Sequence, residues 1–158
     1  MSGQDTLGFS GQSGAFSKAG LTEGTTSATI QIAAANGAGV DFGIDGNAYH
    51  KADTNNITVT AHAIQAVSTS CLYLVQINSA GTVSTKKGNT VLTADLGVIG
   101  GSLQWPIPDA DSVALGGYKV ALNASTTFTN ATTDLGAAGV TDTYYDFLGG
   151  IPLAPQTS

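Results

Sequence analysis

The sequence contains no arginine and only one glutamate, Glu23, and charged residues make up 10% of its 158 positions. Ordinary globular domains carry roughly 25% charged residues, and long Glu, Lys and Arg side chains normally cover the exposed faces of helices. Their scarcity argues against a helical protein. Gly, Ala, Thr, Ser and Asn take their place. Thr suits the pleated surface of a sheet, and Gly and Asn supply turns. The composition therefore predicts a β-rich protein.

Positive charge is also scarce, because five lysines stand against eleven acidic residues and the formal net charge is −6. Nucleic-acid binding requires a basic face that neutralises phosphates, and an anionic membrane surface repels an acidic chain. No segment approaches the roughly 18 consecutive apolar residues of a membrane span. Residues 1–14 lack the basic start and apolar run of a signal peptide. We therefore expect no nucleic-acid or membrane partner and synthesis in the cytoplasm.

The residues that carry enzyme chemistry are few. His50 and His62 are the only histidines and lie twelve positions apart, whereas a metalloprotease helix needs a spacing of four. Cys71 is the only cysteine, so an intramolecular disulfide or a cysteine zinc cluster is impossible, and we expect it to be buried. No Gly-x-Ser-x-Gly elbow is present. The sequence thus predicts a protein that is not an enzyme and has no metal or cofactor.

Alternation of apolar and polar residues predicts about seven to nine short strands separated by turns. Asn36-Gly37 is a strong turn signal, and Asp45-Gly46-Asn47 predicts another turn between two short strands. Ser70–Ile77 is apolar on both faces, as in a central strand that is covered on both sides. The pattern is typical of an all-β antiparallel sandwich or barrel. The expected strands lie within residues 27–35, 40–44, 48–51, 56–66, 70–77, 82–85, 117–124, 126–129 and 143–148.

The two ends of the chain lack the strand pattern of its middle. Residues 1–26 are glycine-rich and predict an extended N-terminal arm, residues 27–150 the β domain, and residues 151–158 a C-terminal tail. The arm is either a disordered tail or a ribbon that docks its spaced apolar residues on a neighbour.

The single tryptophan, Trp105, lies in a segment bounded by prolines, which excludes regular helix and central strand. It either caps the edge of the core or anchors an interface, where tryptophan is enriched.

Two stretches carry a resemblance to a known class of proteins. Residues 109–147 contain Gly-Tyr-Lys-Val-Ala-Leu-Asn-Ala, then Thr-Phe-Thr, then Thr-Thr-Asp-Leu-Gly-Ala-Ala-Gly-Val-Thr-Asp-Thr-Tyr-Tyr-Asp. This stretch resembles a C-terminal pattern of small structural proteins of tailed and related bacteriophages. The hairpin at residues 73–85, with its Ser-Ala-Gly turn, is similar to theirs.

The resemblance implies a virion structural protein of the capsid decoration, or cement, type. Such a protein binds the outer capsid surface and bridges subunits of the major capsid protein, here as an expected homotrimer. The alternative is a tail or fibre-associated binding module, for example for host glycans, and a small hydrolase is the third hypothesis. The residues expected at the interface are Phe9, Phe16, Leu21, Trp105, Ile107, Ile151 and Leu153.

Overall fold

The computed structural model describes residues 13–98 and 100–151. These residues form ten strands in three antiparallel sheets and one short 3-10 turn, η2 (Thr93–Asp95). The expectation of an all-β antiparallel fold is therefore confirmed. The strands are β1 (Gly14–Ala15), β2 (Leu21–Glu23), β3 (Thr29–Ile32), β4 (Val40–Ile44), β5 (Asn47–Lys51), β6 (Thr54–Thr58), β7 (Thr69–Asn78), β8 (Val83–Leu92), β9 (Ser112–Leu122) and β10 (Val140–Asp146).

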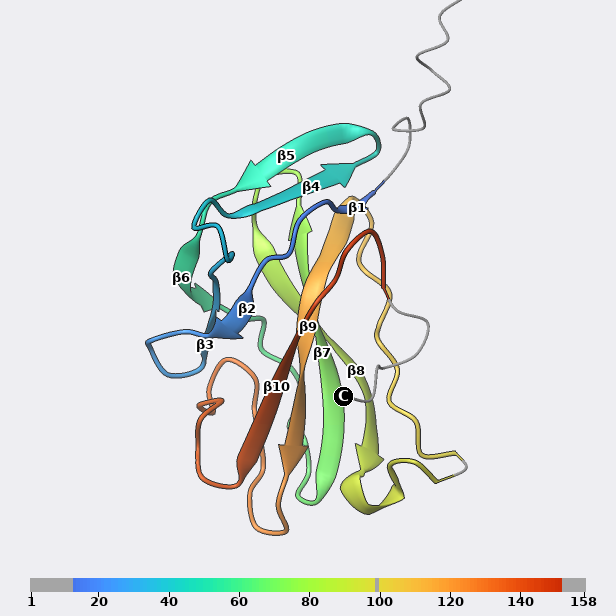
Figure 1. Ribbon diagram of the computed structural model, residues 1–158. Helices are drawn as coiled ribbons and strands as arrows, with labels where there is room; N and C mark the ends of the chain where they lie inside the picture. Colours follow the sequence, from blue (N-terminus) through green and yellow to red (C-terminus); the bar gives the residue numbers. More distant parts are fainter. Residues whose placement is uncertain (1–12, 99, 152–158) are drawn as a thin grey trace, which may run out of the picture.

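The largest sheet has the strand order β10-β9-β7-β8, with β7 and β9 in its interior (Figure 1). Nine of the ten residues of β7 are buried, as the apolar run at residues 70–77 predicted. Tyr73, Val75 and Ile77 belong to the main core. Leu74, which lies between them in sequence, belongs to a second cluster on the opposite face, because successive side chains of a strand point to opposite sides.

Two smaller sheets, β1-β4-β5 and β2-β3-β6, supply the second layer of the fold. Ile30 and Ile32 of β3 and Phe42 of β4 pack in the same core cluster as Tyr73 and Val75 of β7. All three sheets are open, so the fold is a sandwich and not a closed barrel. The hairpin β4–β5 turns at Asp45 and Gly46, whose φ angles of 50° and 81° are those of a tight two-residue hairpin turn.

The structure places part of the expected N-terminal arm inside the domain. Residues 14–15 and 21–23 form β1 and β2, and Ala19 and Leu21 are 0% and 4% exposed in the core. The boundary expected at residue 26 is therefore not a boundary of the fold. Ala19 and Leu21 gave no strand pattern in this glycine-rich stretch, yet strands from distant parts of the chain bury them. Residues 1–12 lie outside the described part.

Two expected strand limits are also corrected. The strand expected at residues 56–66 ends at Thr58, because Thr60 and Thr85 of β8 then bond to each other through their side-chain hydroxyls instead of through a backbone ladder. Strand β8 continues through Gly88 to Leu92, beyond the end expected at residue 85. A Cβ at Gly88 would lie 2.6 Å from the carbonyl oxygen of Gln104, so glycine is needed there for close approach rather than for a turn.

Candidate functional site: a surface where three segments meet

Three segments that the sequence analysis assigned to an interface meet at one end of β9. A hollow of about 210 Å³ is lined by Ser13 and Gly14 before and in β1, by Pro108 of the Trp105 segment, and by residues 149–151 after β10. Residues 112–114 at the start of β9 complete the lining. We call residues 13–14, 107–108 and 148–151 the convergence surface. Segments that are far apart in sequence therefore present one continuous surface.

Glycine makes this meeting of β1 and the chain after β10 possible. The backbone N–H of Gly149 donates a hydrogen bond of 2.8 Å to the carbonyl oxygen of Ala15. A Cβ on Gly14 would lie 2.3 Å from the carbonyl oxygen of Gly149, and Gly149 itself has a φ of 77°. Only glycine satisfies both requirements without strain. These glycines thus allow residues 13–15, which we call the N-terminal root, to pack against residues 148–151, the C-terminal root.

Two residues of the convergence surface, each next in sequence to a residue that lines the hollow, expose apolar side chains. Ile107 is 79% exposed and Leu148 is 56% exposed. Ile151 is half-buried against the second hydrophobic cluster. Single exposed apolar side chains are ordinary, but neighbouring ones around a hollow are typical of interaction surfaces. The surface is therefore suited to contact with another protein.

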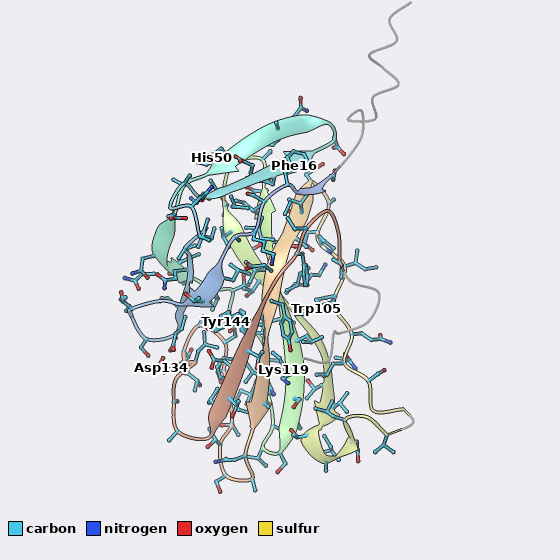
Figure 2. The ribbon with its side chains drawn as sticks, in the orientation of Figure 1. Phe16, His50, Trp105, Lys119, Asp134 and Tyr144 are labelled. Atoms are coloured by element: carbon cyan, nitrogen blue, oxygen red, sulfur yellow. The ribbon has the colours of Figure 1, made fainter. Side chains whose placement is uncertain are left out.

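Trp105 is not part of the convergence surface, but it packs against the same hydrophobic cluster as Ile151. Its ring packs edge-on against Phe147, at a centroid distance of 5.0 Å, and against Tyr145, at 5.6 Å (Figure 2). Gly117 leaves room for it, because a Cβ there would lie 2.3 Å from the indole ring. Partial burial raises the pKa of the Tyr145 hydroxyl. The ring thus acts as a cap of the chain's own outer sheet face, one of the two roles considered for it.

The segment that carries Trp105 and Ile107 is held at its far end by charge. Asp109 accepts hydrogen bonds from Lys86 Nζ at 2.6 Å and from Gln76 Nε2 at 2.6 Å. The bond from Lys86, followed by that from Gln76, holds the pKa of the Asp109 carboxyl below its ordinary value. Because Gln76 also accepts the backbone N–H of Asp109 at 2.8 Å, the segment is anchored to β7 and β8.

The other expected interface residues lie elsewhere. Leu21 is buried in the core, so it is not available to a partner in this structure. Phe16 is 48% exposed, and the tip of its ring lies close to Gly43 of β4, outside the lining of the hollow (Figure 2). Phe9 and Leu153 lie outside the described residues.

The two histidines have separate partners. His50 Nδ1 of β5 lies 2.7 Å from Asp41 Oδ1 of β4, on the exposed hairpin. His62 Nε2 lies 3.0 Å from the carbonyl oxygen of Thr85, and burial lowers the pKa of its imidazole. Among residues 13–98 and 100–151, no group of three or more His, Cys, Asp or Glu side chains is arranged to hold a metal ion.

A buried polar network, which the sequence analysis did not find, ties the sheets together. Tyr118 donates a hydrogen bond of 2.7 Å to Asn130, and Asn130 donates to Thr85 Oγ1 at 3.0 Å. Tyr73 donates to Gln65, which in turn donates to the carbonyl oxygen of Val120. Burial raises the pKa of both tyrosine hydroxyls. These polar groups satisfy one another, so their role in this structure is to hold the core together.

Within the described ranges, no helix is long and apolar enough to cross a membrane. Comparison of the chain with protein-family models, with curated proteins and with solved structures finds no match of any kind.

Proposed function

We propose that this protein is a virion structural protein, a capsid decoration (cement) protein that binds the outer capsid surface and bridges subunits of the major capsid protein. The observation that supports this proposal is the meeting of residues 13–14, Pro108 and residues 149–151 around one hollow, with the exposed apolar residues Ile107 and Leu148 next to them in sequence. A cement protein needs contact area rather than a reactive centre. The convergence surface supplies such area, and a homotrimer carries three copies of it.

The chemistry of the convergence surface favours close packing against a protein partner. Its residues are Ser, Gly, Ile, Pro and Leu, and none of them is charged. Uncharged small side chains lose little solvation when they are buried, and apolar side chains gain about 1.5–3 kcal/mol each. Ile107 and Leu148 are the residues expected to contribute most, because they are the most exposed apolar side chains of this surface.

In this proposal the protein is made in the host cytoplasm, joins the capsid surface as a homotrimer and acts without a cofactor, a nucleic acid or a membrane. Capsid subunits that are bridged by the same trimer can separate only if the contacts of the convergence surface break. Heat resistance of the capsid is therefore the property that the protein is expected to raise.

The test is a double substitution, Ile107→Asp with Leu148→Asp, assayed for binding to undecorated capsids. Loss of two interface side chains that each contribute more than about 1.4 kcal/mol lowers the affinity at least about tenfold for each. The expected result is lower occupancy and lower heat resistance of the capsids. Ile64→Asp is the matched control, since Ile64 is 66% exposed and lies outside the convergence surface.

Antibody labelling of virions separates the capsid role from the tail or fibre role. An antibody against the protein should label the whole head of the virion. Label confined to the tail would replace the proposal by a tail or fibre-associated module. Equal occupancy of capsids by the double variant and by the Ile64→Asp control would show that the convergence surface does not bind the capsid. The N-terminal contribution is measured separately by deleting residues 2–12, which leaves β1 intact.

A further inference from the structure

A second hollow lies at the opposite end of the long sheet. It has a volume of about 430 Å³ and is lined by residues 68, 92–94 and 122–124, which come from the start of β7, the end of β8 and the end of β9. We call it the distal groove. Leu92 is its exposed apolar residue, at 53%, and Val67, which is 37% exposed, directly precedes the lining residue Ser68. The volume falls within the range of about 300–1,000 Å³ that is usual for binding pockets.

No residue of the distal groove is charged: its lining consists of Ser68, Leu92, Thr93, Ala94, Leu122, Asn123 and Ala124. An occupant should therefore be an apolar side chain on an uncharged stretch of chain. This chain has such a stretch outside the described residues, because residues 6–12 read Thr-Leu-Gly-Phe-Ser-Gly-Gln. Leu7 and Phe9 are two positions apart, so an extended backbone presents both on one side.

Distance decides whether this occupant comes from the same molecule. The N-terminal segment joins the fold at Ser13, which lines the hollow at the start of β9, whereas the distal groove is at the end of β9. The eleven residues of β9 span roughly 33 Å at about 3.3 Å per residue. Fully extended chain at about 3.6 Å per residue carries Phe9 only about 14 Å and Leu7 only about 22 Å from Ser13. This reach is shorter than β9, whose two ends lie at opposite ends of the long sheet (Figure 1), so neither side chain reaches the groove of its own molecule.

We infer that the distal groove binds the segment 1–12 of a second copy of this chain, with Leu7 and Phe9 as the inserted side chains. The contact joins the N-terminal root of one copy to the opposite end of the next, so it is heterologous. A heterologous contact closes into a ring when the rotation between copies permits, and a ring of three gives the trimer. This inference deepens the proposed function and rests on it only for the number of copies.

The test uses two single defects and their mixture. The full chain is expected to have the mass of three chains by sedimentation equilibrium in the absence of capsids. Deletion of residues 2–12 removes the inserted segment, and Leu92→Asp places a charge in the groove, so each variant alone should have the mass of one chain. In an equimolar mixture the deletion variant still offers a groove and the Leu92→Asp variant still offers a segment. The mixture should therefore form a one-to-one dimer.

Leu148→Asp is the matched control, because Leu148 is as exposed as Leu92 and lies on the convergence surface. It should keep the mass of three chains and lose only capsid binding, which separates this inference from the proposed function. Circular dichroism confirms that every variant is folded. A full chain with the mass of one chain, a defective variant that keeps the mass of three, or a mixture that stays monomeric would each overturn the inference.

Discussion

Several residues have a role that depends on one close contact. Gly117 of β9 faces the ring of Trp105, and Glu23 of β2 faces the loop between β9 and β10. Neither contact can be inferred from the sequence, because Gly117 is one of 21 glycines and Glu23, although the only glutamate, lies at an ordinary strand end. Their importance comes from atoms that lie far away in the sequence.

Gly117→Ala should destabilise the protein by about 1–3 kcal/mol, the usual effect of forcing extra volume into a packed site. The added Cβ would lie 2.3 Å from the Trp105 ring and 2.5 Å from the carbonyl oxygen of Tyr73. Thermal unfolding measures the loss, at about 2–4 °C for each kcal/mol. Emission from the single tryptophan should shift to longer wavelength as the ring moves outward. Gly150→Ala, which meets nothing within 4 Å, should change neither quantity.

Glu23→Gln should raise the melting temperature, and the gain should grow with pH. Partial burial, and then the hydrogen bond with Asp134, raise the pKa of the Glu23 carboxyl. A carboxyl with a raised pKa stabilises the fold below its unfolded pKa, and this contribution is lost as the pH rises through the folded pKa. Glutamine cannot ionise, and its amide oxygen can still accept the Gly136 N–H that Glu23 accepts at 2.9 Å.

The measurement is the difference in melting temperature between Glu23→Gln and the wild type, from about pH 4 to about pH 7. A difference that stays constant or shrinks with rising pH would show that the Glu23 and Asp134 carboxyls do not oppose docking of the loop between β9 and β10. Asp95→Asn removes the same charge from an exposed position of η2 and controls for net charge.

At the scale of elements, the chain between β6 and β7 is joined to β8 by side chains. Thr60 N–H donates to Thr85 Oγ1, and Thr85 N–H donates to Thr60 Oγ1, both at 3.1 Å. The hydroxyl groups take the place of backbone carbonyls, which explains why an alternating pattern at residues 56–66 did not continue as a strand. Alternation reports which side chains are buried, and it does not report which atoms bond the backbone.

The Thr85→Val substitution should therefore weaken the attachment of the chain between β6 and β7 to β8, while the volume of the side chain hardly changes. Valine keeps the shape of threonine but cannot accept the bonds from Thr60 N–H and from Asn130 Nδ2. Asn130 Nδ2 keeps its bond to the Thr60 carbonyl oxygen, so the expected loss is about 1–3 kcal/mol in total. Urea denaturation should show the loss as a lower midpoint. Thr58→Val, at an exposed position of β6, should leave the midpoint nearly unchanged, and an equal effect of both substitutions would contradict this explanation.

At the scale of the whole molecule, the two hollows lie at opposite ends of β9, so one rigid sheet separates the proposed capsid contact from the proposed contact between copies. Both surfaces have uncharged linings. Binding through them should depend mainly on apolar burial, which salt does not screen.

Capsid occupancy at a fixed protein concentration should therefore change little when the salt concentration rises from about 0.05 M to about 0.5 M, although the Debye length falls severalfold over this range. Co-sedimentation with undecorated capsids measures it. A steep loss of occupancy with salt would show that the acidic surface and not the convergence surface carries the binding.

The sequence by itself determined the all-β class, the central position of residues 70–77 and the hairpin at Asp45-Gly46, because side-chain alternation and turn chemistry are local properties. It also identified Ile107 and Ile151 as candidates, though not that they share a surface. Only the tertiary structure decided that Leu21 is core, that Trp105 caps its own sheet, and that residues 13, 108 and 149 line one hollow. Each of these depends on contacts between segments far apart in the chain, and no local pattern encodes which distant backbone will lie alongside.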